Sequence, residues 1–543
     1  MRHTILWIAA LFAMTGLASC NDFLDETPNK SGSAYIYHMD QLYGLMGSTD
    51  LYLFTSPGYE ASGITANYMC EPVILTDAVE YDPEYYVYGM KARAADTYDI
   101  YCWGTENLLE EQSTMGVTWT PSWERIFRSN TVLANLDNVI QTTEAIRNQV
   151  EGEARFCRAY YHFILLVQYC LWDEDAPGIG YRDATDADGI PERQTVAYTL
   201  SRIYEDLDLA EKALTAAGRT SFDFETNFRP TVPTVQAFRA RVALYRGDYE
   251  TALQNATDAL AAHNTLVTFK DDPEYELESY QNIYLLNETK SEVVDTIHTY
   301  MMINLMNRKA EAIPEYEELY LPSMSSENYF GTNPISEEFY NLWDRENDAR
   351  WLHFYSARQS LLSASGFVMT DTLINGTDTT ILYPCINYEA QQRLKPWYGY
   401  SYLRFFCNGS GSLLGMTTAE MYLIKAECEA RTGNTGAAAE DLRTLRRTRF
   451  YDQTAADNVT GSVQDVLDER FREMGSLWRF FDIKRLNGAE NAGITIRRAI
   501  LTDPTDLNSV TTLEIAPDDP RWALPFYRYE AERMGWEQNA GWK

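Results

Sequence analysis

The chain has 543 residues, with 45 Lys and Arg against 79 Asp and Glu, which gives a formal net charge of −34 at pH 7. A chain of this length can bury a large core and has room for more than one domain. Its excess negative charge repels phosphate backbones and anionic lipid, so we exclude nucleic-acid binding. We expect a ligand that is neutral or that is held by local contacts independent of the overall charge.

The first two dozen residues indicate export and a lipid anchor. Arg2 and His3 precede an apolar run that is too short to span a bilayer, and the run leads to Leu-Ala-Ser-Cys at residues 17–20. This stretch resembles the lipobox of bacterial lipoproteins, in which the cysteine receives a diacylglycerol and cleavage falls just before it. We expect a signal peptide over 1–19, lipidation of Cys20 and a tether over 20–30. The alternative is a plain secretory signal with an incidental cysteine.

An aromatic segment follows. Residues 31–55 are predicted to be helical, and 56–118 to be mostly irregular, which is long for a connection and typical of a binding loop. Seven aromatic residues lie close together here: Tyr81, Tyr85, Tyr86, Tyr88, Tyr98, Tyr101 and Trp103. Tyr and Trp rings match the apolar faces of sugars and lose little rotamer entropy on binding. We predict that Tyr101 and Trp103 contact a glycan, with Asp77 and Tyr81 as hydrogen-bonding neighbours.

Helical pairs make up much of the remaining chain. Apolar residues recur at spacings of three and four near 119–172, 195–262 and 417–449. Two of these pairs turn at Gly247 and Gly433, and alanines stand seven residues before and five after each glycine, where two helices can cross closely. The segment that begins at Gly247, Gly-Asp-Tyr-Glu-Thr-Ala-Leu, resembles the turn and second helix of a tetratricopeptide (TPR) repeat.

The insertion between the helical pairs, residues 264–415, mixes loops with a small amount of strand. Residues 291–300 carry the β-branched Val293-Val294 and Ile297 and are predicted to form a strand, and Asn375-Gly376 between apolar segments predicts a β-hairpin. Tyr316 and Tyr320 belong to a second aromatic cluster and are further candidates for glycan contact. A third cluster comprises Trp397, Tyr398, Tyr400 and Tyr402. The final stretch, 463–543, is expected to begin with one charged helix and to end in irregular structure.

Signals for metals, cofactors and catalysis are weak. With Cys20 lipidated, seven cysteines remain without C-x-x-C spacing, so no disulfide framework is expected, although a Cys70–Cys102 bridge stays open. The stretch Asp183–Gly189 is similar to a calcium loop, but Ala184 and Thr195 stand where acidic residues belong, which favours an acidic turn over calcium binding. There is no H-E-x-x-H, phosphate loop or nucleophile elbow. We therefore predict no cofactor, no metal site and no enzyme activity.

Motifs along the chain resemble those of the SusD/RagB family of outer-membrane nutrient-binding lipoproteins. The similarity spans nearly the whole chain after the signal, in the family's order. It comprises Cys20–Asp25, Trp119-x3-Trp123-x2-Ile126-x3-Asn130, Glu153–Tyr161, Pro334–Arg350, Ala419–Glu427, Glu469-Arg470-x2-Glu473, Arg479-x2-Asp482-x2-Arg485 and Gln538–Trp542.

The resemblance implies a mainly α fold in which TPR-like helical pairs form a scaffold that carries long irregular loops and a small amount of β-hairpin, with 31–543 as a single unit. It further implies a lipid-anchored protein on the outer surface of the outer membrane. The partner would be a SusC-like TonB-dependent transporter, which faces the TPR side, and the glycan site would lie in the loops. The charged motifs at 469–485 are expected to form an ion-pair network, and Gln538-Asn539 to satisfy backbone groups.

Four functions remain open at this stage. Capture of oligosaccharide or polysaccharide for a transporter is favoured by the aromatic cluster at 81–103. Capture of peptides or another nutrient by the same kind of complex, as in RagB-like relatives, is the alternative. A TPR interaction scaffold has no need of the long loops, and a surface glycosidase would need a carboxylate pair whose separation the sequence does not give.

Overall fold

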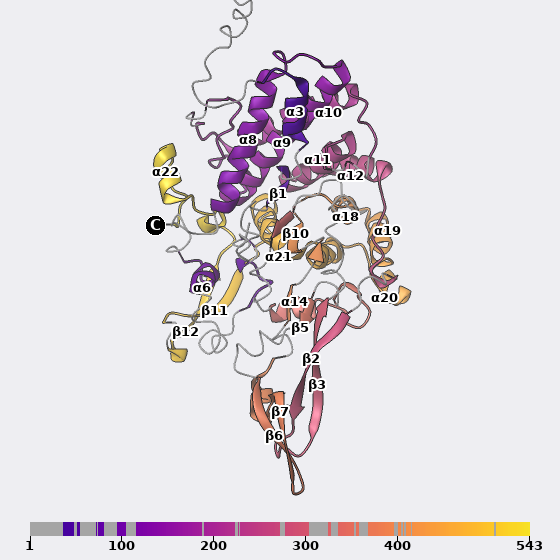
Figure 1. Cartoon of the computed structure of the whole chain (residues 1–543), viewed down its shortest axis with the longest axis vertical. Coiled ribbons are helices and arrows are strands. Elements are labelled where there is room, and N and C mark those ends of the chain that lie inside the picture. The colour runs from indigo at the N-terminus through magenta and orange to yellow at the C-terminus, as the bar shows by residue number, and fades with distance from the viewer. Residues whose placement is uncertain are drawn as a thin grey trace, which may run out of the picture.

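We describe a computed structural model of the chain (Figure 1). The structure describes residues 36–47, 51–54, 72, 74–80, 95–104, 116–186, 189, 191–222, 226, 228–271, 277–302, 324–326, 335–351, 355–357, 368–395, 400–402, 405–406, 409–413, 415–503 and 506–542.

The helices of these residues are α3 (Met39–Met46), α6 (Ala95–Tyr101), α8 (Gly116–Asn135), α9 (Glu144–Tyr169), α10 (Val196–Ala216), α11 (Val232–Arg246), α12 (Tyr249–Ala262), α14 (Glu337–Asn341), α17 (Tyr388–Arg393), α18 (Thr418–Arg431), α19 (Thr435–Arg446), α20 (Gln453–Asp457), α21 (Val463–Glu490) and α22 (Arg528–Met534). The strands are β1 (Leu53–Phe54), β2 (Leu277–Leu286), β3 (Val293–Met302), β4 (Met324–Ser326), β5 (Tyr355–Ala357), β6 (Met369–Asn375), β7 (Asp378–Ile386), β8 (Tyr400–Tyr402), β9 (Phe405–Phe406), β10 (Gly409–Leu413), β11 (Ile496–Leu501) and β12 (Val510–Ile515). The predicted mainly α class is confirmed.

Helix α9 is the centre of the helical scaffold. It packs against α8 on one side and α10 on another, and also contacts α3 and α11 (Figure 1). From Phe156 to Tyr169 every side chain is buried, which is the pattern of a helix surrounded by neighbours rather than one with a single apolar stripe.

The two predicted glycine turns are confirmed. Gly247 ends α11 and Gly433 follows α18, and both have the positive φ, 79° and 88°, that glycine adopts without steric cost. The next residue caps the second helix of each pair: the Asp248 side chain accepts a hydrogen bond from Thr251 N, and Asn434 accepts one from Ala437 N. The expected close crossings are present as well, because the alanines at 240, 252, 426 and 438 are fully buried.

Helix α21 runs through the middle of the molecule and changes direction at Gly475, where φ is 71° and ψ is −172° (Figure 1). It contacts α11, α18 and α19. The bend allows one element to carry Glu469 and Glu473 on its first part and Arg479 on its second.

The insertion carries a four-stranded sheet that projects from the helical body (Figure 1). Its strand order is β3-β2-β7-β6, and β2 pairs antiparallel with β3 and parallel with β7. The predicted hairpin is confirmed as β6–β7, with Asn375 opposite Asp378 and Gly376 at a positive φ in the turn.

Two local expectations differ from the structure. Within the described residues of 31–55 the helix is α3 alone, and β1 follows it. Most of 56–118, expected to be mostly irregular, lies outside the described residues, and the part that is described includes α6 and the start of α8. The C-terminal stretch is not irregular, because β11 and β12 pair antiparallel and α22 follows. The two strands are separated by residues 502–509 rather than by a short turn, so the local hairpin signal is missing from the sequence.

No helix in the described part of the chain is long and apolar enough to cross a membrane. The predicted signal peptide, Cys20 and the tether lie outside the described residues. Cys102 carries a free thiol.

Candidate functional site

Trp103 and Tyr101, the two rings predicted to contact a glycan, are core residues. Trp103 is 2% exposed and Tyr101 is fully buried. The Trp103 ring lies parallel to Trp542 with centroids 6.4 Å apart, and edge-on to Trp522 at 5.4 Å. A ring enclosed by other rings has no face left for a sugar, so the structure corrects this assignment: both residues anchor the C-terminal segment.

Arg498 of β11 binds the segment 74–76, which precedes the aromatic stretch that begins at Tyr81. Its guanidinium donates to the backbone oxygens of Ile74 (3.0 Å), Thr76 (2.6 Å) and Tyr101 (2.9 Å) and lies over the Tyr101 ring. One buried cation thereby satisfies backbone oxygens of the 74–76 segment and of the last residue of α6 and holds the two together.

Asp77 is engaged in an ion pair rather than free for a ligand. Arg479 donates to its carboxylate through Nε (2.9 Å to Oδ1) and through Nη2 (2.6 Å to Oδ2). The two side chains are 14% and 15% exposed, and the Arg479 guanidinium also lies over the Phe471 ring. A carboxylate held on both oxygens by one guanidinium is a rigid anchor for the chain on either side of it.

Next to Asp77, two distant segments are joined through their backbones. Val79 and Ile335 form an antiparallel bridge. Ser336 donates through its amide to Ala78 O (2.8 Å) and through Oγ to Asp77 O (2.6 Å). The end of 74–80 therefore lies beside the start of 335–341.

Glu80 brings a third segment to the same place. One carboxylate oxygen accepts a hydrogen bond from Glu337 N at 3.3 Å, and the other lies 3.7 Å from Lys395 Nζ. We call the group Asp77, Glu80, Ser336, Lys395 and Arg479 the loop junction.

The loop junction is where the chain leaves for, or returns from, each aromatic cluster identified in the sequence. Tyr81 follows Glu80, and Trp397 lies two residues after Lys395. The stretch with Tyr316 and Tyr320 leads first into β4, and the chain then reaches Ile335. Tyr81, Tyr316 and Tyr320 themselves lie outside the described residues. The structure thus brings together the attachment points of three segments that the sequence shows only as separate.

The exposed rim of the loop junction is acidic. Glu337 and Glu338 are exposed at the start of α14. Although the residue as a whole is exposed, partial desolvation of the Glu338 carboxyl and the neighbouring Asp77 carboxylate raise its pKa, and Arg479 opposes that rise. Carboxylate oxygens at this rim can accept hydrogen bonds from the hydroxyls of a neutral ligand.

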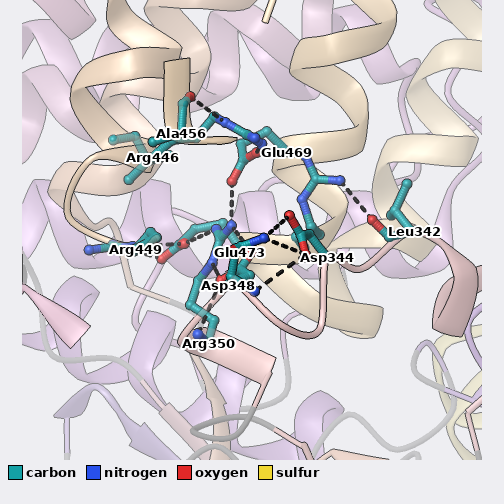
Figure 2. Close-up of polar contacts among 12 residues, drawn as sticks. Leu342, Asp344, Asp348, Arg350, Arg446, Arg449, Ala456, Glu469 and Glu473 are labelled. Atoms are coloured by element: carbon teal, nitrogen blue, oxygen red, sulfur yellow. Dashed lines mark hydrogen bonds and ion pairs between the residues drawn. The ribbon is translucent and has the colours of Figure 1, made fainter. Parts of the chain in front are cut away.

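A buried ion-pair network surrounds Arg350, Glu469 and Glu473 (Figure 2). Arg350 donates to Asp348, to Glu469 (2.6 Å) and to Glu473 (2.7 Å), and all four side chains are essentially buried. Arg446 and Arg449 bind the same two glutamates from α19 and the residues after it. This confirms that Glu469 and Glu473 belong to an ion-pair network, and Figure 2 shows that it joins α21 to the segment after α14.

The network keeps the Glu469 carboxylate charged. Burial by itself raises the pKa of Glu469, but the guanidinium groups of Arg350, Arg472 and Arg446 outweigh burial and hold that pKa well below its ordinary value. Arg472 also donates to Leu342 O at 3.1 Å. The segment after α14 is therefore fixed on α21 by charged contacts.

The remaining charged motifs form a second buried group. Arg485 donates to both oxygens of Glu427 at 2.8 Å and to Asp482, which also accepts from Arg470. At the C-terminus, Asn539 donates to Tyr169 O and Leu524 O at 2.7 Å, as expected of a residue that satisfies backbone groups. Within the described residues, no three or more His, Cys, Asp or Glu side chains are placed to hold a metal ion.

Sequence reasoning did not single out Glu80, Ser336 or Lys395. Their partners are remote: Ser336 and Asp77 are 259 positions apart, and Glu337 and Glu80 are 257 apart. No local pattern marks such residues. Arg479 was noticed only as part of a charged motif, and its pairing with Asp77 is visible only in the fold.

Comparison with known proteins agrees with this architecture. The profile of a SusD-like family described as starch-binding and associating with the outer membrane matches residues 77–244. A second profile, SusD_RagB of the SusD family, matches residues 376–512. No curated protein matches in a comparison of sequences.

Solved structures share the fold at low identity. A SusD superfamily protein of Bacteroides thetaiotaomicron is 17% identical, with a TM-score of 0.58 over 92% of this chain and 99% of the other. Surface glycan-binding protein A of Bacteroides uniformis is 17% identical, with a TM-score of 0.54 over the same shares. A laminarin-binding SusD-like protein is 15% identical, with a TM-score of 0.51 over 94% and 100%. With the two family profiles in chain order and this fold, the chain belongs to the SusD/RagB family.

Proposed function

We propose that this protein captures glycan at the cell surface and delivers it to a SusC-like TonB-dependent transporter. It is exported by residues 1–19, lipidated at Cys20 and joined to the outer membrane by the tether 20–30, so that 31–543 acts as one unit outside the cell. The observation that carries the proposal is the loop junction, where Glu80, Ser336 and Lys395 gather the attachment points of three aromatic segments.

Tyr81, Tyr316 and Tyr320 are the ring contacts in this proposal. Rings that stack on apolar sugar faces, next to carboxylates that accept from hydroxyls, form a site suited to a neutral sugar. Glu337 and Glu338 supply those acceptors at the exposed rim. The net charge of −34 points the same way, because an anionic polymer would be repelled.

The fold neighbours support a glycan ligand, since a laminarin-binding and a surface glycan-binding protein share the architecture. The helical pairs α11–α12 and α18–α19 are the proposed transporter side. The protein acts by binding, without catalysis, cofactor or metal.

Affinity electrophoresis tests the proposal. The chain from Asn21 onward, which contains every described residue, is run through gels containing laminarin, amylopectin, arabinoxylan or mannan. We expect retardation by at least one polymer, and its loss in the triple variant Tyr81→Ala, Tyr316→Ala, Tyr320→Ala. Tyr529→Ala is the matched control, because Tyr529 is an exposed ring on α22.

The same gels separate the alternatives. Turnover of a retarding polymer would indicate a glycosidase. If no polymer retards the protein and calorimetry shows that it binds a mixed peptide digest, glycan capture is contradicted and the RagB-like capture of peptides is favoured.

A further inference from the structure

One face of the β6–β7 hairpin is apolar and exposed. Thr372 pairs with Ile381 and Ile374 with Thr379, so these four side chains share a face of the two-stranded ladder. Tyr383 follows Ile381 by two residues on β7, in the stretch between Leu382 and Cys385 where the register shifts. Ile381 is 75% exposed, Tyr383 is 59% exposed and Ile374 is 43% exposed.

This exposure belongs to a hairpin that is held in place. On the opposite face Leu373 and Leu382 are half-buried, and Lys290 in the β2–β3 turn makes a 2.9 Å ion pair with Asp371. The Lys290 carbonyl also accepts from Ile374 N at 2.7 Å. At the base of β7, Cys385 and Ile386 are fully buried. The apolar face is therefore a fixed surface of the sheet.

Charge around this face restricts what can occupy it. Apart from Lys290, the charged residues with described side chains on the two hairpins are acidic: Glu288, Glu292, Asp295, Asp371 and Asp378. A second copy of the chain would bring the same negative charge, and phosphate or anionic lipid would be repelled. A neutral polymer meets no such barrier. A ring, two aliphatic side chains and two threonine hydroxyls suit the mixed apolar and hydroxyl surface of a sugar chain.

The face is also joined to the loop junction. Strand β7 leads into α17, whose first residue, Tyr388, is 39% exposed, and α17 leads to Lys395. Gln391 of α17 donates to Leu286 O at the end of β2 at 2.6 Å, which fixes this connection on the sheet. A chain bound at the loop junction can thus continue toward the hairpin over the surface of one connected segment.

We propose that the face formed by Thr372, Ile374, Thr379 and Ile381, together with the exposed Tyr383 that follows it on β7, is a second contact for a neutral polysaccharide. This inference rests on the proposed function. It adds that the hairpin binds the part of a long chain that extends past the loop junction. A ligand that spans both contacts gains affinity through effective concentration, whereas a short fragment that fills only one contact does not.

The test compares a polymer with its own short fragments. The double variant Ile381→Ser, Tyr383→Ser is measured against the chain from Asn21 onward, first in gels of whichever neutral polymer retards the unchanged protein. Calorimetry then measures short oligosaccharides cut from that polymer. We expect about tenfold weaker binding of the polymer and unchanged binding of the oligosaccharides. Unchanged oligosaccharide binding also shows that the variant is folded.

A matched control carries Tyr529→Ser and Val510→Ser, a ring and an aliphatic residue that are also exposed but lie on α22 and β12. We expect this control to bind the polymer as the unchanged protein does. Equal retardation of the hairpin variant and the unchanged protein would overturn the inference and leave the face to a protein partner. A parallel loss for polymer and fragments would overturn it too. If no polymer retards the unchanged protein, the proposed function fails first, which is a separate result.

Discussion

Arg479 and Asp77 are 402 positions apart in the sequence and form a two-pronged ion pair, with Nη2 2.6 Å from Oδ2 and Nε 2.9 Å from Oδ1. The pair joins the second part of α21 to the segment that leads into the first aromatic loop. Because Ser336 bonds to the Asp77 carbonyl, this contact also positions the segment before α14.

Replacing Asp77 by Asn is expected to weaken glycan capture and to lower the free energy of unfolding by about 2 kcal/mol. Arg479 would be left partly buried without its counter-charge, which costs more than loss of an exposed pair and less than loss of a fully buried one. Urea unfolding and affinity electrophoresis measure the two effects. Asp519→Asn is the control, since Asp519 holds Arg521 in a similar but local pair. Equal effects of the two substitutions on glycan capture would contradict a positioning role for Asp77.

Removal of Arg350 is expected to be strongly destabilising. Asp348 contacts Arg350 through both carboxylate oxygens and is itself buried, so Arg350→Met leaves a buried charge without its partner. Breaking a buried ion pair in this way costs about 4 kcal/mol. Urea unfolding provides the measurement, with Arg447→Met as the control, because Arg447 forms exposed pairs with Asp457 and Glu440. We expect the control to lose less than about 1 kcal/mol; similar losses would show that the buried network is not what holds α21 in place.

The stability of the α18–α19 pair is expected to depend on pH through Asp441. Burial raises the pKa of Asp441 to about 7, assisted by Glu429 and opposed by Lys425, whose Nζ lies 2.6 Å from Oδ2. An acid with a higher pKa when folded binds its proton more tightly in the folded chain. Its contribution therefore favours folding at low pH and is lost as pH rises from about 4 toward about 7.

Asp441→Asn isolates this contribution. Urea unfolding of the unchanged protein and the variant across pH 4 to 8 gives two profiles. The free energy of unfolding of the variant, minus that of the unchanged protein, should increase as pH rises through this window. A difference that stays constant with pH would rule out titration of Asp441.

Trp103→Ala is expected to act on stability rather than on ligand contact. Deleting a buried indole that packs on Trp522 and Trp542 costs about 3–5 kcal/mol. Trp103→Phe should cost less, because part of the ring packing remains. Thermal unfolding gives the stability, and polymer binding is measured at a temperature where both variants remain folded. Retained binding is the expected result, whereas loss of binding by a folded Trp103→Phe variant would restore this residue to the ligand site.

The sequence alone determined the features of this protein that depend on neighbours along the chain. Helical pairs, the turns at Gly247 and Gly433, their Asp248 and Asn434 caps and the β6–β7 hairpin follow from local spacing and local backbone preference. Family membership was accessible for the same reason, because its motifs are short runs read in order.

Only the tertiary structure decided which aromatic and charged residues meet. Trp103 and Tyr383 are both aromatic residues outside the regular helical pairs, yet Trp103 is enclosed by Trp522 and Trp542 while Tyr383 faces solvent. In the same way, Asp77 forms an ion pair with Arg479, and Glu80 forms one with Lys395. Burial and ion pairing depend on contacts between residues hundreds of positions apart, and no local pattern encodes them.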